Sequence, residues 1–179
     1  MKDARAYLIA GPESSGTRML TGMLVAAGCS GDAGDAQRWD SRPPRAAEHP
    51  VIVWRRSVPH GGEWPDLTGM CGELRAAGYG RLRMLVTVRD RFCLERSQPK
   101  RGHVHSAEAA RANIERSYRH IFEHLLAMPE LPCVMVPYES LVLHGSKASA
   151  ALLELVGLDR PRGFPAARDE NAKYYGGRP

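Results

Sequence analysis

The sequence predicts one α/β domain, in which a parallel sheet lies between helices on both faces as a three-layer structure. Short, wholly apolar runs alternate with amphipathic segments along the 179 residues, an order typical of folds with buried parallel strands. The composition, 43% hydrophobic and 25% charged, is that of an ordinary globular protein. A chain of this length buries roughly 70% of its unfolded surface on folding, so residues 1–179 are expected to form a single domain.

The elements follow from the spacing of apolar residues. The first expected strand covers residues 6–10, and an expected helix over 17–27 stops at Gly28. Between residues 106 and 128 apolar or small residues recur at gaps of three or four, which traces one helical face. The other expected elements are, in order, a long loop over 30–50, a strand over 51–54, a helix over 66–77, a strand over 84–88, a strand over 133–136, a helix over 149–156 and an irregular tail over 160–179.

Membrane, secretory and metal-bound classes are disfavoured. No apolar run approaches the roughly 18 residues that a membrane-spanning helix needs, and the run at 6–10 is too short for the core of a secretory signal. Four cysteines, Cys29, Cys71, Cys93 and Cys133, lie far apart and without zinc-site spacing. We therefore expect a cytoplasmic protein with free thiols, no membrane partner and no metal.

The positive charge is made almost entirely of arginine. The formal net charge of +5 comes from 25 basic and 20 acidic residues, and 21 of the basic residues are Arg. Guanidinium groups bind phosphate and sulfate oxygens through a planar fork of donors, although most of these arginines are expected on the solvated surface. Basic residues form no block and are not interleaved with aromatic residues, so nucleic acid is not expected as a partner.

The turn after the first expected strand carries the main functional signal. It reads Gly11-Pro12-Glu13-Ser14-Ser15-Gly16-Thr17-Arg18, and its glycines have the spacing of a P-loop, in which backbone N–H groups surround an anion at the start of a helix. The expected fold is accordingly P-loop NTPase-like. Thr17 stands at the position of the Walker lysine, and Arg18 at that of the hydroxyl that holds Mg²⁺. A cation there repels Mg²⁺, which disfavours ATP or GTP hydrolysis but keeps anion binding.

This loop resembles the 5′-phosphosulfate loop of the sulfotransferases that use 3′-phosphoadenosine 5′-phosphosulfate (PAPS). That loop carries Ser-Gly-Thr, as at Ser15, Gly16 and Thr17, and lacks the Walker lysine. A second match lies after the strand expected at 84–88, where Arg89 is followed eight residues later by Ser97, as are the family's Arg and Ser that hold the 3′-phosphate.

A third match is structural rather than chemical. Residues 134–141 and the expected helix after them are similar to the family's strand, Tyr-Glu-Asp-Leu corner and following helix. The resemblance thus covers roughly residues 6 to 158 in order.

The resemblance implies transfer of a sulfuryl group from PAPS to a hydroxyl or amine of a small-molecule or glycan acceptor, by in-line displacement without a metal. The family's usual loop Lys or Arg is Ser14 here. The cation that stabilises the bridging oxygen is therefore expected to be another residue, Arg18, Arg55 or Arg56. The residues implied in binding PAPS are Ser14, Ser15, Gly16, Thr17 and Arg18 at its 5′ side, and Arg89 and Ser97 at its 3′-phosphate.

The candidate base for the acceptor is His60, which follows the strand expected at 51–54, near where the family often carries a histidine. The pKa of an imidazole suits proton removal near neutral pH. Glu13 is a second candidate base, and the loop over 30–50 is where acceptor recognition is expected. Two alternatives remain: a catalytically silent nucleotide- or anion-binding module, and a divergent P-loop small-molecule kinase.

Overall fold

The computed structural model describes residues 4–31, 42–161 and 167–175. A five-stranded sheet forms its centre, in the order β2-β3-β1-β4-β5, and every strand pair is parallel. The strands are β1 (Arg5–Pro12), β2 (Ser30–Gly31), β3 (Val51–Val58), β4 (Arg81–Val88) and β5 (Cys133–Pro137). The predicted three-layer α/β fold is confirmed.

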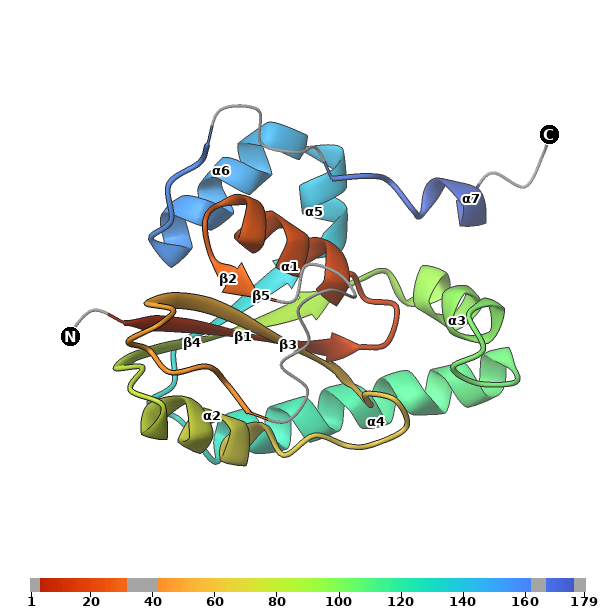
Figure 1. Cartoon of the computed structure of the whole chain (residues 1–179). Coiled ribbons are helices and arrows are strands. Elements are labelled where there is room, and N and C mark those ends of the chain that lie inside the picture. The colour runs from red at the N-terminus through yellow and green to blue at the C-terminus, as the bar shows by residue number, and fades with distance from the viewer. Residues whose placement is uncertain (1–3, 32–41, 162–166, 176–179) are drawn as a thin grey trace.

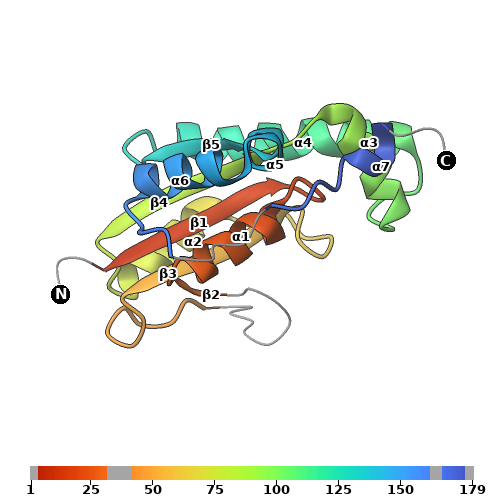
Figure 2. The same cartoon turned by 90° about the horizontal axis from the view of Figure 1, so that it is seen from above.

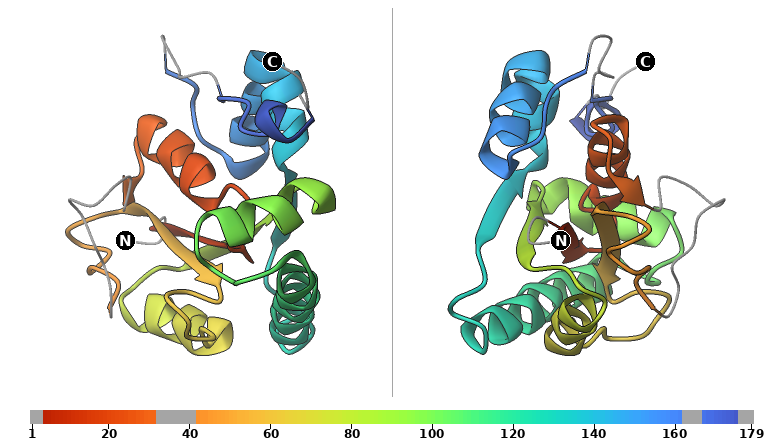
Figure 3. Two further views of the ribbon diagram at one scale, coloured as in Figure 1. Left: turned by 90° about the vertical axis from the view of Figure 1, so that its right-hand side faces the viewer. Right: turned by 60° about the vertical axis from the view of Figure 1, so that its left-hand side comes forward.

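Helices cover both faces of the sheet, as Figures 1 and 3 show. One face carries α1, α5 and α6, and the other carries α2 and α4. The helices are α1 (Thr17–Ala26), α2 (Leu67–Ala76), α3 (Arg91–Lys100), α4 (Ala107–Leu126), α5 (Tyr138–Leu143), α6 (Gly145–Val156) and α7 (Ala172–Tyr175).

Alternation along each strand divides the core into two clusters. On β1, Leu8 and Ala10 pack toward α2 and α4, whereas Tyr7 and Ile9 pack toward α1 and α6. This is the period-two geometry of a strand that is buried on both sides. Strand positions thus decide which side of the sheet a polar residue near a strand end will face.

The structure corrects several expected boundaries. The loop expected over 30–50 begins with the two-residue strand β2, and residues 32–41 lie outside the described residues. Strand β3 runs four residues further than expected, to Val58, and the helix expected at 149–156 starts at Gly145 and is preceded by α5. The tail expected to be irregular over 160–179 contains the short helix α7; residues 162–166 and 176–179 lie outside the described part.

Two helices gather beyond the carboxyl ends of the strands. Figure 2 shows α3 and α7 together at that end of the molecule, and the rings of Phe92 and Tyr175 stack there with centroids 5.8 Å apart. The C-terminal segment therefore returns to the edge of the sheet at which ligands bind in open α/β folds.

Candidate functional site

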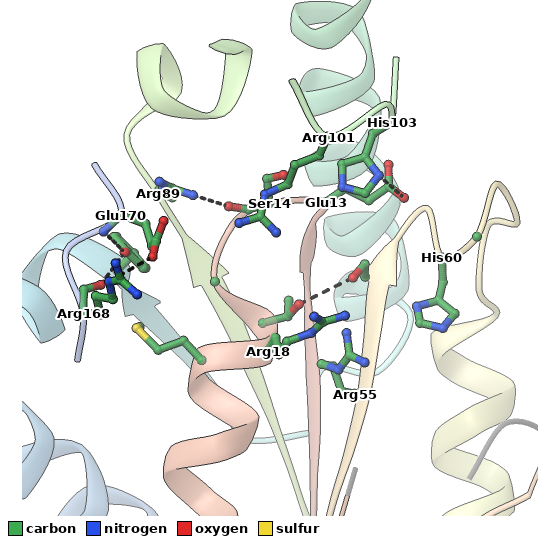
Figure 4. Close-up of a pocket in the computed structure, with 16 residues that line it drawn as sticks. Glu13, Ser14, Arg18, Arg55, His60, Arg89, Arg101, His103, Arg168 and Glu170 are labelled. Carbon is green, nitrogen blue, oxygen red and sulfur yellow. Dashed lines mark hydrogen bonds and ion pairs between the residues drawn. The ribbon is translucent and has the colours of Figure 1, made fainter. Parts of the chain in front are cut away.

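A cavity of about 680 Å³ opens at the carboxyl ends of the strands (Figure 4). Its walls come from the segments that directly follow β1, β3, β4 and β5, together with the loop after α3 and the C-terminal segment. Chain segments far apart in sequence meet here because parallel strands present their carboxyl ends at one edge.

The cavity is strongly cationic. Five arginines line it against two carboxylates, Glu13 and Glu170. With both histidines neutral this leaves three positive charges in excess, so the cavity suits an anion of high charge. The lining arginines are Arg18, Arg55, Arg89, Arg101 and Arg168.

The loop between β1 and α1 has the tight curvature of an anion-binding turn. Ser14 and Gly16 have φ angles of 70° and 101°, and no side chain caps the start of α1, where the first amides of a helix lack partners within it. The hydroxyls of Ser15 and Thr87 hydrogen-bond at 2.5 Å and tie the loop to β4. The N–H of Ser15 already donates to the carbonyl of Pro12, which leaves the first amides of α1 as the backbone donors suited to an anion.

Arg89 stands at the end of β4, as the motif predicts, and is nearly buried at 6% exposure. Its Nε donates to Asn171 Oδ1 at 2.7 Å and its Nη1 to the carbonyl of Ser14 at 2.7 Å. The guanidinium also lies 4.6 Å from the centroid of the Tyr138 ring. Arg89 thereby joins the loop, the β5 corner and the C-terminal segment in one network while lining the cavity.

The C-terminal segment is anchored at this network. The hydroxyl of Tyr138 donates to the carbonyl of Arg168 and accepts the N–H of Glu170, both at 2.8 Å. Asn171 is buried, and its amide donates to Glu139 Oε1 at 2.7 Å. The sequence assigned none of these residues to the site, although Tyr138 and Glu139 directly follow β5 and so occupy a position where ligands bind.

Ser97 lies apart from the cavity lining. It sits on α3 at 1% exposure, and its hydroxyl has no hydrogen-bond partner among the described residues. The structure thus places Arg89 in the cavity wall and Ser97 in the interior, outside the lining. A buried hydroxyl without a partner is unusual in a native fold.

The arginines predicted to replace the missing loop cation divide between two sides of the sheet. Arg18, in the first turn of α1, and Arg55, on β3, both line the cavity. Arg56 points the other way: its guanidinium lies 4.9 Å from the centroid of the Trp54 ring and donates to the Arg55 carbonyl. Arg18 and Arg55 are therefore the two placed to act near the loop.

Thr17 and Ser14 also border the cavity. The hydroxyl of Thr17 lies 3.5 Å from that of Ser57 on β3. The hydroxyl of Ser14 is buried without a hydrogen-bond partner among the described residues. Together with Gly16, these residues place most of the predicted binding loop at the cavity.

Both candidate bases line the cavity. His60 lies just past β3 and pairs with Glu63 through a short backbone bridge. Glu13 lies in the loop after β1, and burial raises the pKa of its carboxyl above the usual range. His103, which the sequence did not single out, approaches Glu13 with 3.4 Å between Nδ1 and Oε1.

Within residues 4–31, 42–161 and 167–175, no group of three His, Cys, Asp or Glu side chains could hold a metal ion. None of the helices described there is both long and apolar enough to cross a bilayer.

Comparison with known proteins gives a structural relative but no sequence relative. No family model matches the sequence, and no curated protein matches it. Among solved structures, the sulfotransferase domain of the olefin synthase from Synechococcus PCC 7002 is similar, with a TM-score of 0.60 over 88% of this chain and 74% of that chain. This chain therefore has the fold of a sulfotransferase domain. Because the sequence identity is only 12%, the likeness shows the fold alone.

Proposed function

We propose that this protein is a PAPS-dependent sulfotransferase, which transfers a sulfuryl group to a hydroxyl or amine of a small-molecule or glycan acceptor. The observation that carries the proposal is the arginine-lined cavity at the carboxyl edge of the sheet, in a chain with the fold of a sulfotransferase domain. PAPS is a compact polyanion, and guanidinium groups are the side chains best suited to its phosphate and sulfate oxygens.

The residues present fit that donor. The buried hydroxyl of Ser14, which borders the cavity, lacks a hydrogen-bond partner among the described residues, and a phosphate oxygen would supply one. Arg89 lines the cavity at the predicted strand end. The start of α1 has no side-chain cap and favours an anion through its amides and dipole.

The chemistry needs in-line positioning, neutralisation of the charge on the leaving phosphate, and a base for the acceptor. Arg18 and Arg55 would neutralise the charge near the loop, in place of the cation absent at Ser14. Thr17 would hold the donor through its hydroxyl, and His60 is the base predicted from the sequence. PAPS itself supplies the activated sulfuryl group.

A second function is favoured by one observation. Ser14 stands where the related loops carry a cation, and a module that kept anion binding without catalysis would tolerate that change. Such a module would bind the product nucleotide, 3′-phosphoadenosine 5′-phosphate (PAP), but would not turn over PAPS. A small-molecule kinase would instead require ATP with Mg²⁺.

Calorimetry with PAP, with and without Mg²⁺, tests the proposal. We expect binding that does not depend on the metal and that weakens in Arg89→Ala by about 2–3 kcal/mol, as for hydrogen bonds to charged groups. Arg18→Ala keeps the fold because Arg18 is exposed, and it should also weaken binding. Arg75→Ala is the matched control, since Arg75 is an exposed arginine paired with Glu130 outside the cavity. Binding of ATP but not PAP, only with Mg²⁺, would reject the proposal in favour of a kinase.

A further inference from the structure

A carboxylate and an imidazole face one another in the cavity wall, on the side away from Arg89 (Figure 4). Glu13 belongs to the loop after β1, and His103 to the loop between α3 and α4. Glu13 Oε1 lies 3.4 Å from His103 Nδ1, and both residues line the cavity. The same wall therefore holds a histidine with a carboxylate at one of its ring nitrogens.

One buried residue holds both partners in place. The side chain of Gln98 donates to the carbonyl of Glu13 at 3.0 Å, and the backbone carbonyl of Gln98 accepts the N–H of His103 at 3.0 Å. Gln98 is fully buried, and Asn113 on α4 donates to its side-chain oxygen at 3.1 Å. The backbones that carry the pair are thus held by α3 and α4, and support of this kind favours a preorganised site.

The surroundings favour an imidazole that is ready to accept a proton. Burial, and to a lesser degree the positive charge of Arg101, lower the pKa of His103 below its usual value. The charged groups that face it are Glu13 from the loop after β1 and Arg101 from the end of α3, while Arg18 and Arg55 line the same cavity. Both effects favour the neutral form of the ring, which is the form that can accept a proton.

We propose that His103 is the catalytic base of the transfer and that Glu13 is its positioning residue, an inference that rests on the proposed function. The acceptor oxygen or nitrogen forms its bond to sulfur while the bond from sulfur to the bridging phosphate oxygen breaks, and that electron pair stays on the leaving PAP. The acceptor proton passes to Nε2 of His103. The Glu13 carboxylate then stabilises the imidazolium through Nδ1–H, the role that a carboxylate has beside other catalytic histidines.

This assignment differs from the one that the sequence favours. His60 lies on the wall formed by the segment after β3, whereas His103 comes from the α3–α4 loop, some forty residues later in the chain. The geometry points to His103 because a carboxylate oxygen lies 3.4 Å from its Nδ1, where it favours the tautomer with the proton on Nδ1 and leaves Nε2 as the acceptor. The two histidines can be separated by substitution.

The pairing is tested first without donor or acceptor. The ring C–H resonances of His103 are assigned by their loss in His103→Gln and followed against pH in the wild type and in Glu13→Gln. We expect the midpoint to move to lower pH in Glu13→Gln, because the imidazolium loses the neighbouring carboxylate. An unchanged midpoint would overturn the pairing.

The catalytic role is tested by PAP calorimetry and PAPS turnover against a panel of phenols, alcohols and amines. We expect His103→Gln to lower kcat by about 10²–10⁴-fold, the usual contribution of a positioned base, with PAP affinity kept. Glu13→Gln should shift the acidic limb of the kcat/KM profile to lower pH. His144→Gln is the control, since His144 is exposed between α5 and α6.

The outcomes separate this inference from the proposed function. Wild-type protein that binds no PAP would overturn both. If PAP binds and turnover persists in His103→Gln but is lost in His60→Gln, the sulfotransferase assignment stands and His103 is not the base. PAP binding without turnover of any acceptor would favour the silent module and would likewise overturn the role of His103.

Discussion

Asn171→Ala tests whether the C-terminal segment is part of the site or merely lies near it. The side chain of Asn171 accepts from Arg89 Nε and donates to Glu139 Oε1, with both distances 2.7 Å. Asn171 itself is 4% exposed. Replacement by Ala removes both hydrogen bonds at once and leaves two charged groups with one partner fewer.

The expected loss can be worked from these contacts. Hydrogen bonds to charged groups stabilise a fold by about 1.5–3 kcal/mol each. Arg89 keeps its bond to the Ser14 carbonyl and its place against the Tyr138 ring, and water in the adjoining cavity can replace part of what is lost. We therefore expect unfolding free energy to fall by about 2–3 kcal/mol, which lowers Tm by roughly 4–12 °C in a chain of this size.

Urea denaturation and thermal melts measure this change. Lys173→Ala is the matched control in the same segment, because the Lys173–Glu170 pair lies at the surface with both side chains partly exposed, and surface pairs contribute less than about 1 kcal/mol. A loss below 0.5 kcal/mol (on the order of measurement scatter) in Asn171→Ala, or an equal loss in the control, would show that the segment is not held through Arg89.

Three further predictions concern packing and thiol reactivity. Gly11→Ala should destabilise by at least about 1–3 kcal/mol, because a Cβ there would stand 2.0 Å from Thr87 Oγ1; a near-neutral result in urea denaturation would contradict the tight join of loop and β4. Gly22→Ala should stabilise by up to about 1 kcal/mol, since nothing lies within 4 Å of the added atom in α1; a loss would contradict the open space there. A thiol reagent should label only Cys133 in the native protein, faster as pH rises, because it is the one exposed thiol and its pKa is raised by partial burial; rapid labelling in Cys133→Ser would refute this.

The layers of the fold can be predicted from the sequence because apolar residues recur with a characteristic spacing in strands and helices. The length of β3 was predicted too short, since the strand continues through Arg55, Arg56 and Ser57 to Val58. These polar residues end an apolar run, yet the strand persists because it remains paired with β1 as far as Val58. A strand of two residues, such as β2, is too short to show any spacing of apolar residues, so the sequence does not predict it.

The candidate site was predictable only in part. The loop and Arg89 carry local spacing that a single sequence displays, whereas the partner of Arg89 lies 82 residues away, at Asn171. The Glu13–His103 contact likewise spans 90 residues and depends on how α3 packs on α4. The positions of Tyr138 and Glu139 directly after β5 are the part of this network that the strand order could have indicated.

The arginines of the cavity are of two kinds, and this decides which variants report on binding. Arg89 is nearly buried and joins three segments, so Arg89→Ala removes structural support and an anion ligand together. Arg18 is exposed, and its loss should weaken PAP binding without changing unfolding free energy. Because a ligand that binds only the native state stabilises it by RT ln(1 + [L]/Kd), weaker binding should make the rise in Tm on adding PAP smaller in Arg18→Ala, from an unchanged baseline. In Asn171→Ala the baseline itself should fall. If Arg18→Ala and Asn171→Ala changed the baseline Tm and the PAP-induced rise in the same way, the residues that bind the anion could not be separated from those that hold the structural network.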